Sequence, residues 1–244
     1  MLPAPPTPRD DWALFLDIDG TLIDFAATPE GVIVPPTLRA TLAALQQWLG
    51  GAVALVSGRA MVGIEALFAP LELPVSGQHG AELRLGAETV AMPPHPAMPA
   101  IAVTLEKFAA AHPGVRVENK GRSIAVHYRG APAVGDQAWA LARKLVAEAG
   151  DGLELMSANM AVDIKRRGIS KGSAVDWFMA RAPFAGRVPV FIGDDRTDED
   201  GFAAVNARGG ISIHIGTGNT DAYFCISSPV ALREWLASSV RCRK

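Results

Sequence analysis

An apolar run that ends in two aspartates, within residues 14–22, strongly limits the folds open to this chain. The run leads into Asp17, Ile18, Asp19 and Gly20. Side chains two positions apart in an extended chain point the same way, so we expect the carboxyls of Asp17 and Asp19 to face a common space. Two carboxylates held that close repel each other, and a divalent metal ion between them would relieve the repulsion. The alternative is a surface turn, because Asp-Gly is common turn chemistry.

Apolar strands and amphipathic helices alternate around this stretch. Residues 12–16 and 52–56 are nearly all apolar, as expected of strands buried on both faces of a parallel sheet. Residues 60–68 predict a helix, and an earlier helix is indicated by leucines at helical spacing: Leu38, Leu42, Leu45 and Leu49. Strand, helix, strand, helix is the start of an α/β fold. Outside this alternation we expect residues 1–10 to be an unpacked lead-in and residues 25–36 to be a loop.

A stretch with four prolines, residues 93–99, separates this pattern from a different one. Before it, residues 74–85 predict a strand and a hairpin. After it the expected elements are a helix (97–111), two strands (115–118 and 123–128), a second helix (133–149) and two further strands (153–156 and 160–165). This α-β-β-α-β-β order predicts a small antiparallel-sheet module inserted into the first domain.

The α/β pattern resumes near residue 168. Residues 171–181 predict a helix, and residues 188–192 predict a buried strand in which Pro189 must lie at the start or at an edge. That strand runs into the acidic residues 193–200. A helix through Phe202 and Val205, a strand at 211–215 and a helix near 230–239 complete the expected elements.

Charge and composition exclude several classes of function. The chain has 23 lysines and arginines against 25 aspartates and glutamates, and it lacks the basic block of a general nucleic-acid or membrane-surface binder. Its apolar runs are shorter than the roughly 20 residues that span a bilayer, and its first residues do not resemble a signal peptide. Cys225 and Cys242 lack metal-ligand spacing, which favours a reduced, cytoplasmic protein. We expect a monomer that binds neither nucleic acid nor membrane.

Polar groups stand at the ends of expected strands or at the start of a helix. They are Asp17 with Asp19, Ser57, Lys171, and Asp194 with Asp195 and Asp198. The carboxyl ends of parallel strands line one edge of a sheet, where ligands bind, so we expect these groups to converge. Asp17 and Asp194 could hold Mg²⁺. The Ser57 hydroxyl and the Lys171 charge would then supply the donors that a phosphoryl group needs.

Each group also has a purely structural alternative. The acidic run could serve only to start a helix, since Thr197 with Asp200 forms an acceptable capping box. Lys171 could be a solvated surface lysine, and Ser57 with Gly58 could be a simple turn. All of these alternatives would have to hold at one edge of one sheet, which favours the functional interpretation.

Four ordered motifs in this chain resemble those of the haloacid dehalogenase-like phosphatases. The motifs are Asp17-Ile18-Asp19-Gly20-Thr21, Val56-Ser57-Gly58-Arg59, Lys171-Gly172 and Gly193-Asp194-Asp195-Arg196-Thr197-Asp198. Within that superfamily the chain is most similar to the trehalose-6-phosphate phosphatase family. The segments that carry this closer similarity are Glu118-Asn119-Lys120-Gly121, Val126-His127-Tyr128-Arg129 and residues 162–172. The resemblance implies a Rossmann-like parallel-sheet hydrolase core (residues 1–94 and 168–244) with an inserted α+β (αββαββ) cap domain (residues 95–167).

The resemblance also implies a role for each motif residue in the core. Asp17 would attack phosphorus and form an aspartyl-phosphate, while Asp19 would protonate the departing sugar oxygen and later take a proton from water. Mg²⁺ would be bound by Asp17, the Asp19 backbone carbonyl and Asp194. Asp198 would orient the water shell or Lys171. Phosphoryl oxygens would be held by the remaining motif residues: Ser57, Gly58, Arg59 and Lys171.

For the sugar, the family's cap residues fall on Glu118, Lys120 and Asp163. Asp163 departs from the usual glutamate and is one methylene shorter. The expected activity is Mg²⁺-dependent hydrolysis of a small-molecule sugar phosphate, trehalose 6-phosphate. The alternatives are a phosphatase or phosphomutase for another sugar phosphate, and a catalytically silent sugar-phosphate sensor.

Overall fold

The computed structural model describes residues 2–24, 32–158 and 160–241. The chain divides into two compact units: unit 1 comprises residues 1–90 and 170–244, and unit 2 comprises residues 91–169. The boundaries predicted from the sequence were 94/95 and 167/168. In the described part of the chain, helices are too short or too polar to cross a bilayer. The predicted loop residues 25–31, the turn residue Asn159 and Cys242 lie outside the described residues.

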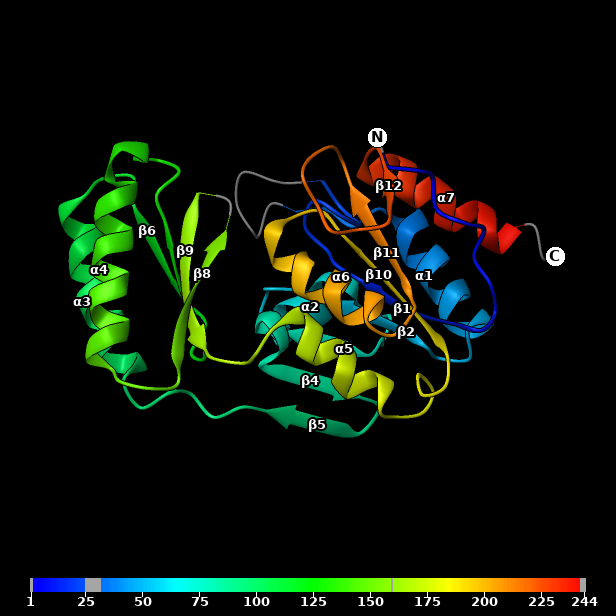
Figure 1. The fold of residues 1–244 in the computed structure, drawn as a ribbon, viewed down its shortest axis with the longest axis horizontal. Coiled ribbons are helices and arrows are strands. Elements are labelled where there is room, and N and C mark those ends of the chain that lie inside the picture. Colours follow the sequence, from blue (N-terminus) through cyan, green and yellow to red (C-terminus); the bar gives the residue numbers. More distant parts are fainter. Residues whose placement is uncertain (1, 25–31, 159, 242–244) are drawn as a thin grey trace. The chain divides into compact units, whose positions relative to one another are not determined.

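Unit 1 is built on an eight-stranded sheet with the order β12-β11-β10-β1-β2-β3-β4-β5 (Figure 1). Neighbouring strands from β12 to β3 run parallel, and β4 is antiparallel to β3. The strands are β1 (Trp12–Leu16), β2 (Val53–Val56), β3 (Val75–Gly77), β4 (Glu82–Leu85), β5 (Glu88–Ala91), β10 (Val188–Gly193), β11 (Ile211–Ile215) and β12 (Phe224–Ile226). The predicted α/β class with a parallel-sheet core is confirmed.

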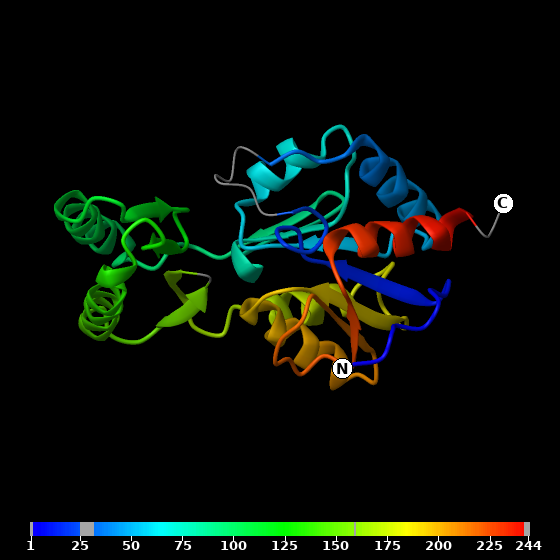
Figure 2. The ribbon, with the colours of Figure 1, turned by 90° about the horizontal axis from the view of Figure 1, so that it is seen from above.

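Helices cover both faces of this sheet. They are α1 (Pro36–Trp48), α2 (Met61–Phe68), α5 (Lys171–Met179), α6 (Glu199–Asn206) and α7 (Pro229–Arg241), with 3₁₀ turns η2 (Gln78–Gly80) and η4 (Arg196–Asp198). Figure 2 shows α1, α2 and α7 on one side and α5 and α6 on the other. Because both faces are covered, β1 and β2 are buried at every residue. This double burial explains why the sequence shows these strands as continuous apolar runs.

Several details of unit 1 differ from the sequence-based expectation. β5 and β12 were missed because they are short, lie at or near the sheet edges and carry partly exposed residues. The lead-in was wrongly expected to be unpacked: the Cys225 N–H donates to the Pro3 carbonyl at 3.0 Å, so the N-terminal segment lies along β12. Pro189 is the second residue of the interior strand β10, at the start of the strand as expected.

Unit 2 is a four-stranded antiparallel sheet with two helices on one face. Its elements are α3 (Met98–Ala111), β6 (Arg116–Asn119), β7 (Ile124–His127), η3 (Pro132–Val134), α4 (Gly135–Glu148), β8 (Leu153–Ala158) and β9 (Ala161–Arg166). The strand order is β6-β7-β9-β8, and α3 and α4 lie side by side against the sheet (Figure 1). Ile124, Val126, Val162 and Ile164 form the core with these helices. The alternate residues of the strands therefore point to the face that the helices leave uncovered.

Candidate active site

Three adjacent strands of unit 1 deliver polar residues to one edge of the sheet. β10, β1 and β2 are neighbours and parallel, and their last residues are followed by Asp194, Asp17 and Ser57 respectively. The Asp17 N–H continues the strand pairing by donating to the Ile192 carbonyl at 2.9 Å. The structure therefore brings the ends of the predicted motifs together at the carboxyl edge, where α/β sheets bind ligands.

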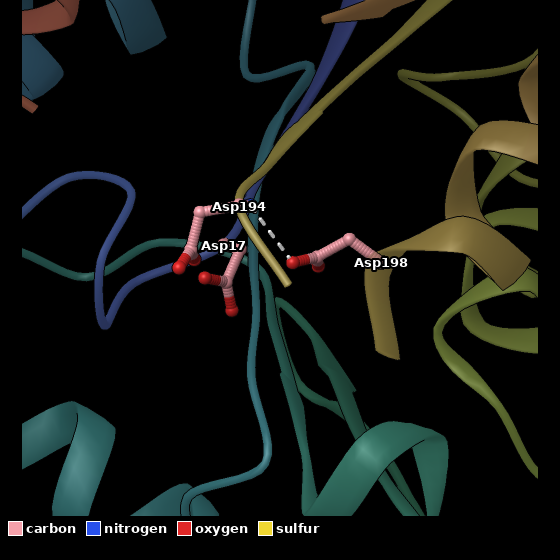
Figure 3. A group of neighbouring side chains, drawn as sticks. All are labelled: Asp17, Asp194 and Asp198. Carbon is pink, nitrogen blue, oxygen red and sulfur yellow. Dashed lines mark hydrogen bonds between the residues drawn. The ribbon is translucent and has the colours of Figure 1, made fainter. Parts of the chain in front are cut away.

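Three carboxyl groups gather at this edge. One oxygen from each of Asp17, Asp194 and Asp198 lies within 4.8 Å of the others, and Figure 3 shows the side chains turned toward a common space. Asp17 and Asp198 are buried, and Asp194 is partly buried. The Thr21 hydroxyl donates to Asp194 at 2.9 Å and fixes the orientation of that carboxyl.

Lys171 links two of these carboxylates. Its Nζ donates to Asp17 Oδ1 at 2.7 Å and to Asp198 Oδ1 at 2.6 Å, with all three side chains buried. The other oxygen of Asp198 accepts the backbone N–H groups of Asp194 and Asp195, both at 3.0 Å. Both oxygens of Asp198 are thus occupied by protein donors, which makes it a residue that positions Lys171 and the acidic loop.

Negative charge exceeds positive charge at the site. Burial first, and then the neighbouring carboxylates Asp17 and Asp195, raise the pKa of Asp194 to about 8. Burial likewise raises the pKa values of Asp17 and Asp198. Burial opposes the charge of Lys171, but the surrounding carboxylates outweigh it and hold the pKa of this ammonium well above its usual value. All four pKa values are raised, as expected where several buried carboxyls surround one ammonium.

This donor set fits a hard divalent cation. Mg²⁺ takes oxygen ligands and uses one or two carboxylates while keeping several waters. Asp17 and Asp194 offer such oxygens, whereas Asp198 already accepts from three donors. A bound dication would also offset the charge excess that raises the pKa of Asp194. The arrangement can therefore hold a metal ion beside Asp17.

Local capping interactions hold Lys171 and the acidic loop in place. Ser170 caps α5 reciprocally with Ser173, so Lys171 is the first residue of a well-anchored helix. In the acidic loop the capping box joins Asp195 and Asp198, so the predicted Thr197–Asp200 pair is wrong. Asp195 accepts from the Thr197 N–H at 2.7 Å and from its hydroxyl at 2.6 Å. Burial is the largest influence on Asp195 and opposes its ionisation, but the charge of Lys171 and the hydrogen bonds from Thr197 together outweigh burial and lower the pKa of this carboxyl.

The carboxyl of Asp19 lies in a different interaction from that of Asp17. Asp19 forms a bidentate ion pair with Arg59, through Nε at 2.6 Å and Nη2 at 2.6 Å. It is not among the three clustered carboxyls found in the described residues. Paired arginine–carboxylate bonds fix geometry as well as charge. Through this ion pair, Arg59 of the Val56–Arg59 motif contacts Asp19 of the Asp17–Thr21 motif.

The residues expected to bind the sugar lie on strands of unit 2. Glu118 on β6, Ala125 on β7 and Asp163 on β9 are cross-strand partners, so their side chains share the face of that sheet opposite α3 and α4, where Ala125 and Asp163 are buried. His127 Nε2 lies 3.1 Å from Glu118 Oε2, and Lys120 Nζ lies 3.7 Å from the same oxygen. The hydrogen bond from His127 is the largest influence that lowers the pKa of Glu118.

Comparison with known proteins decides the family. A family model described as Trehalose-phosphatase matches residues 15–224. The chain belongs to the trehalose-phosphatase family. The trehalose-6-phosphate phosphatase of Escherichia coli K12 is 41% identical over 227 residues, covering 92% of this chain and 85% of that protein. A probable trehalose-phosphate phosphatase of Sinorhizobium fredii NGR234 is 42% identical, covering 95% of this chain and 89% of that protein.

Solved structures agree on the fold. The C-terminal domain of the C. albicans trehalose-6-phosphate phosphatase matches with a TM-score of 0.86 at 20% identity, covering 99% of this chain and 98% of that one. A phosphatase of the haloalkanoate superfamily from Bacteroides thetaiotaomicron matches with a TM-score of 0.61 at 19% identity, covering 93% of this chain and 94% of that one. At such identities these matches establish the fold alone, which is that of the superfamily suggested by the sequence motifs.

Sequence reasoning assigned no role to several residues at this trehalose-phosphatase site. Thr21 lies inside the first motif, but only the structure shows that its hydroxyl binds Asp194. Glu82 accepts from the Met61 N–H at 2.8 Å and so caps α2, which follows the Ser57 loop. From the sequence, His79 could line the cleft or be a hydrogen-bonded structural histidine. The signal that could have placed His79 at the site is the expected turn at Gly77 and Gln78, because a turn directly after a parallel strand lies at the carboxyl edge of the sheet.

Proposed function

We propose that this chain hydrolyses trehalose 6-phosphate to trehalose and phosphate with Mg²⁺, through an aspartyl-phosphate on Asp17. The observation that carries the proposal is the buried Asp17–Lys171–Asp198 ion-pair chain beside Asp194, at the carboxyl edge of the sheet. Membership of the trehalose-phosphatase family supports the choice of substrate.

In this mechanism Asp17 and Lys171 act on the phosphoryl group together. Lys171 donates to one oxygen of Asp17 at 2.7 Å, which opposes the rise in the pKa of Asp17 caused by burial and orients this carboxylate for attack on phosphorus. Lys171 and the Ser57 hydroxyl would hold phosphoryl oxygens, since charge in the transition state spreads over three of them. Bound Mg²⁺, held by Asp17 and Asp194 with the Asp19 backbone carbonyl, would neutralise phosphoryl charge.

Proton transfer is assigned to Asp19. As Asp17 forms its bond to phosphorus, the bond from phosphorus to the sugar oxygen breaks and Asp19 gives that oxygen a proton. In the second step Asp19 takes a proton from the water that attacks phosphorus, so Asp17 is released as a carboxylate together with phosphate. The bidentate contact with Arg59 holds the Asp19 side chain in a defined place. Both oxygens of Asp19 accept in that contact, so one of them must leave Arg59 to carry the proton.

Glu118, Lys120 and Asp163 are proposed to recognise sugar hydroxyls. Glu118 is an ionised acceptor flanked by the donors His127 and Lys120, a mixture of acceptor and donors that suits neighbouring hydroxyl groups. Site carboxylates left unpaired by a wrong sugar cost free energy, which favours selectivity. Asp163, with its shorter side chain, is proposed to reach the sugar through water.

The deciding experiment is phosphate release from a panel of sugar phosphates, with and without Mg²⁺. Trehalose 6-phosphate should be turned over fastest, and turnover should require the metal. Asp17→Asn should abolish it, whereas Asp176→Asn, at an exposed ion pair with Arg208, should leave it unchanged. Faster turnover of another sugar phosphate would show that this other compound is the substrate. Retention of the phosphate on the product would indicate a phosphomutase, and no turnover of any compound would indicate a catalytically silent sensor.

Two further proposals concern the cellular compartment and the oligomeric state. We propose a cytoplasmic enzyme, on the sequence evidence of only two cysteines, and the described cysteine, Cys225, is a free thiol. A monomer is proposed, and its mass in solution can be measured by light scattering during the same assays.

A further inference from the structure

The turn η2 contains two residues in a backbone conformation that neither favours. Gln78 has φ 47° and His79 has φ 57°, in the left-handed region that glycine and asparagine enter most easily. Such conformations are unfavourable for residues with a side chain, and they persist where the surrounding structure imposes them. The contacts of this turn therefore indicate what it holds in place.

The turn is bound to both ends of the loop Ser57–Arg59, whose Ser57 hydroxyl is proposed above to hold a phosphoryl oxygen. The Gln78 N–H donates to the Arg59 carbonyl at 2.8 Å, and the His79 N–H donates to the Ser57 carbonyl at 3.0 Å. Within the loop, the Arg59 N–H donates to Ser57 Oγ at 3.2 Å. Ser57 Oγ accepts this bond, so its own O–H can be directed to a phosphoryl oxygen. The strained turn thus fixes a loop whose donors must be preorganised.

The imidazole of His79 covers the middle of that loop. A Cβ placed on Gly58 would lie 2.5 Å from both Cε1 and Nε2 of His79, closer than any real Cβ contact. His79 is buried, with 6% of the residue exposed, and η2 also packs against α5, whose first residue is Lys171. The ring fills the space that a side chain at position 58 would need, so it packs directly on the Gly58 backbone. A shift of the ring would therefore move the backbone beside Ser57.

We propose that His79 is a positioning residue for phosphoryl transfer: its imidazole, seated on Gly58, holds the Ser57–Arg59 loop in the geometry that receives the phosphoryl oxygens. The inference rests on the proposed function, because it takes this loop to be the phosphoryl-binding loop. The backbone bonds of the turn are available to any residue that accepts its conformation, whereas the contact with Gly58 needs the ring. A variant that lacks the ring should therefore still form the turn but should have a lower rate of turnover.

The first test is His79→Gly, since glycine adopts φ 57° freely and keeps the turn while the ring is removed. We expect kcat for trehalose 6-phosphate to fall at least tenfold, KM to change less than threefold, and the inhibition constant of vanadate to rise in parallel. Vanadate mimics the transferring phosphoryl group, so its binding reports the loop without the sugar. Circular dichroism verifies that the variant is folded. A folded variant with unchanged kcat and unchanged vanadate inhibition would overturn the proposal.

A double-mutant cycle tests the contact itself, and its first arm, Gly58→Ala with His79 present, does not require His79→Gly to be folded. Gly58→Ala should lower kcat at least tenfold in the presence of His79, because the new Cβ displaces the ring. In the His79→Gly background the same change should cost less than threefold, since the space is vacated. Equal effects in both backgrounds would show that the ring does not act through Gly58. Gly63→Ala is the matched control, because its Cβ would meet nothing within 4 Å.

These measurements distinguish a failure of the His79 proposal from a failure of the proposed substrate. If the wild-type chain releases no phosphate from trehalose 6-phosphate, the proposed substrate is wrong. The same cycle is then measured on p-nitrophenyl phosphate turnover and on vanadate binding by calorimetry with Mg²⁺. Non-additive effects there would support the role of His79 for whatever phosphate ester the site takes. Additive effects would reject it.

Discussion

At the scale of single residues, the site depends on how charge is balanced around Lys171. This ammonium is buried between Asp17 and Asp198, at 2.7 and 2.6 Å. Breaking a buried ion pair by removing one partner leaves an uncompensated charge, which typically costs 3–5 kcal/mol. Lys171 is therefore both a catalytic group in the proposed mechanism and a stabilising one.

Removal of that charge should affect stability and turnover together. We expect Lys171→Met to abolish turnover and to lower the free energy of unfolding of the metal-free protein by about 3 kcal/mol, as measured by urea denaturation. Lys171→Met with Asp198→Asn should recover part of the stability but none of the activity, because one buried carboxylate is removed. Lys144→Met, at an exposed pair with Glu148, is the control and should change stability by less than about 0.5 kcal/mol. Equal stability of the Lys171→Met and Lys144→Met proteins would contradict this account.

At the scale of elements, the start of α5 connects local sequence to the site. The Ser170 hydroxyl oxygen accepts the Ser173 N–H at 3.2 Å, and the Ser170 N–H donates in return to the Ser173 hydroxyl oxygen at 2.9 Å. The helix begins at the next residue, Lys171. A cap that weakens would let the first turn of the helix fray, and the ammonium would lose its fixed position.

Ser170→Ala should therefore destabilise the protein by about 1 kcal/mol, with a range of roughly 0.5–2 kcal/mol for lost N-caps. For a chain of this size that corresponds to a fall in Tm of about 2–4 °C, measurable by calorimetry, and we expect kcat to fall several-fold. Ser238→Ala removes a serine hydroxyl inside α7 that bonds the Trp235 carbonyl and should have the smaller effect. A larger loss from Ser238→Ala would show that Ser170 is not an effective cap.

The uncovered face of the unit 2 sheet gives a prediction about specificity. Glu118 is held by His127 and Lys120 on that face. We expect Glu118→Ala to raise KM for trehalose 6-phosphate about tenfold, which corresponds to about 1.4 kcal/mol of lost binding. KM for p-nitrophenyl phosphate, which has no sugar, should stay within twofold. Glu106→Ala, on the exposed side of α3, is the control, and equal effects of Glu118→Ala on both substrates would remove its role in recognition.

The elements that sequence could predict are those whose local pattern agrees with their burial. β1, β2 and β10 are buried on both faces and show continuous apolar runs, and α1 shows its buried leucines at helical spacing. β12 has three residues and β5 is mostly exposed, so neither carries a periodic signal. Their existence depends on pairing with the sheet, which only tertiary structure supplies.

At the scale of the whole molecule, the topology of unit 1 explains why distant motifs meet. Thr21 and Asp194 are 173 positions apart and Asp17 and Lys171 are 154 apart, yet each pair is hydrogen-bonded. The rule that ligands bind at the carboxyl ends of parallel strands predicted this convergence from the sequence. It could not predict which oxygen meets which donor. The Arg59 pairing with Asp19 and the seat of His79 on Gly58 depend on side-chain rotamers and on a strained turn.

The charge excess of the site as a whole predicts linked effects of pH and metal. Burial and the neighbouring carboxylates raise the pKa of Asp194 to about 8 in the folded, metal-free protein, from the usual 3.8 of an aspartate. Because the folded value is the higher one, its contribution to stability is fully present below pH 4 and is lost as pH rises through 8. For one such group the free energy of unfolding falls by at most about 1.4 kcal/mol per pH unit within that window.

We therefore expect the Tm of the metal-free protein to fall between pH 6 and pH 8.5, and saturating Mg²⁺ to reduce or reverse that fall. Mg²⁺ binds the ionised carboxyls, so its affinity should rise with pH up to about 8, with a proton released on binding. Calorimetric titrations in buffers of different ionisation enthalpy measure that proton. Asp194→Asn removes the titrating group and should both flatten the pH dependence of the metal-free protein and weaken Mg²⁺ binding. A metal-free Tm that is constant across this range, with Mg²⁺ bound equally well at pH 6 and pH 8, would show that Asp194 is already ionised at pH 6 and would contradict this account.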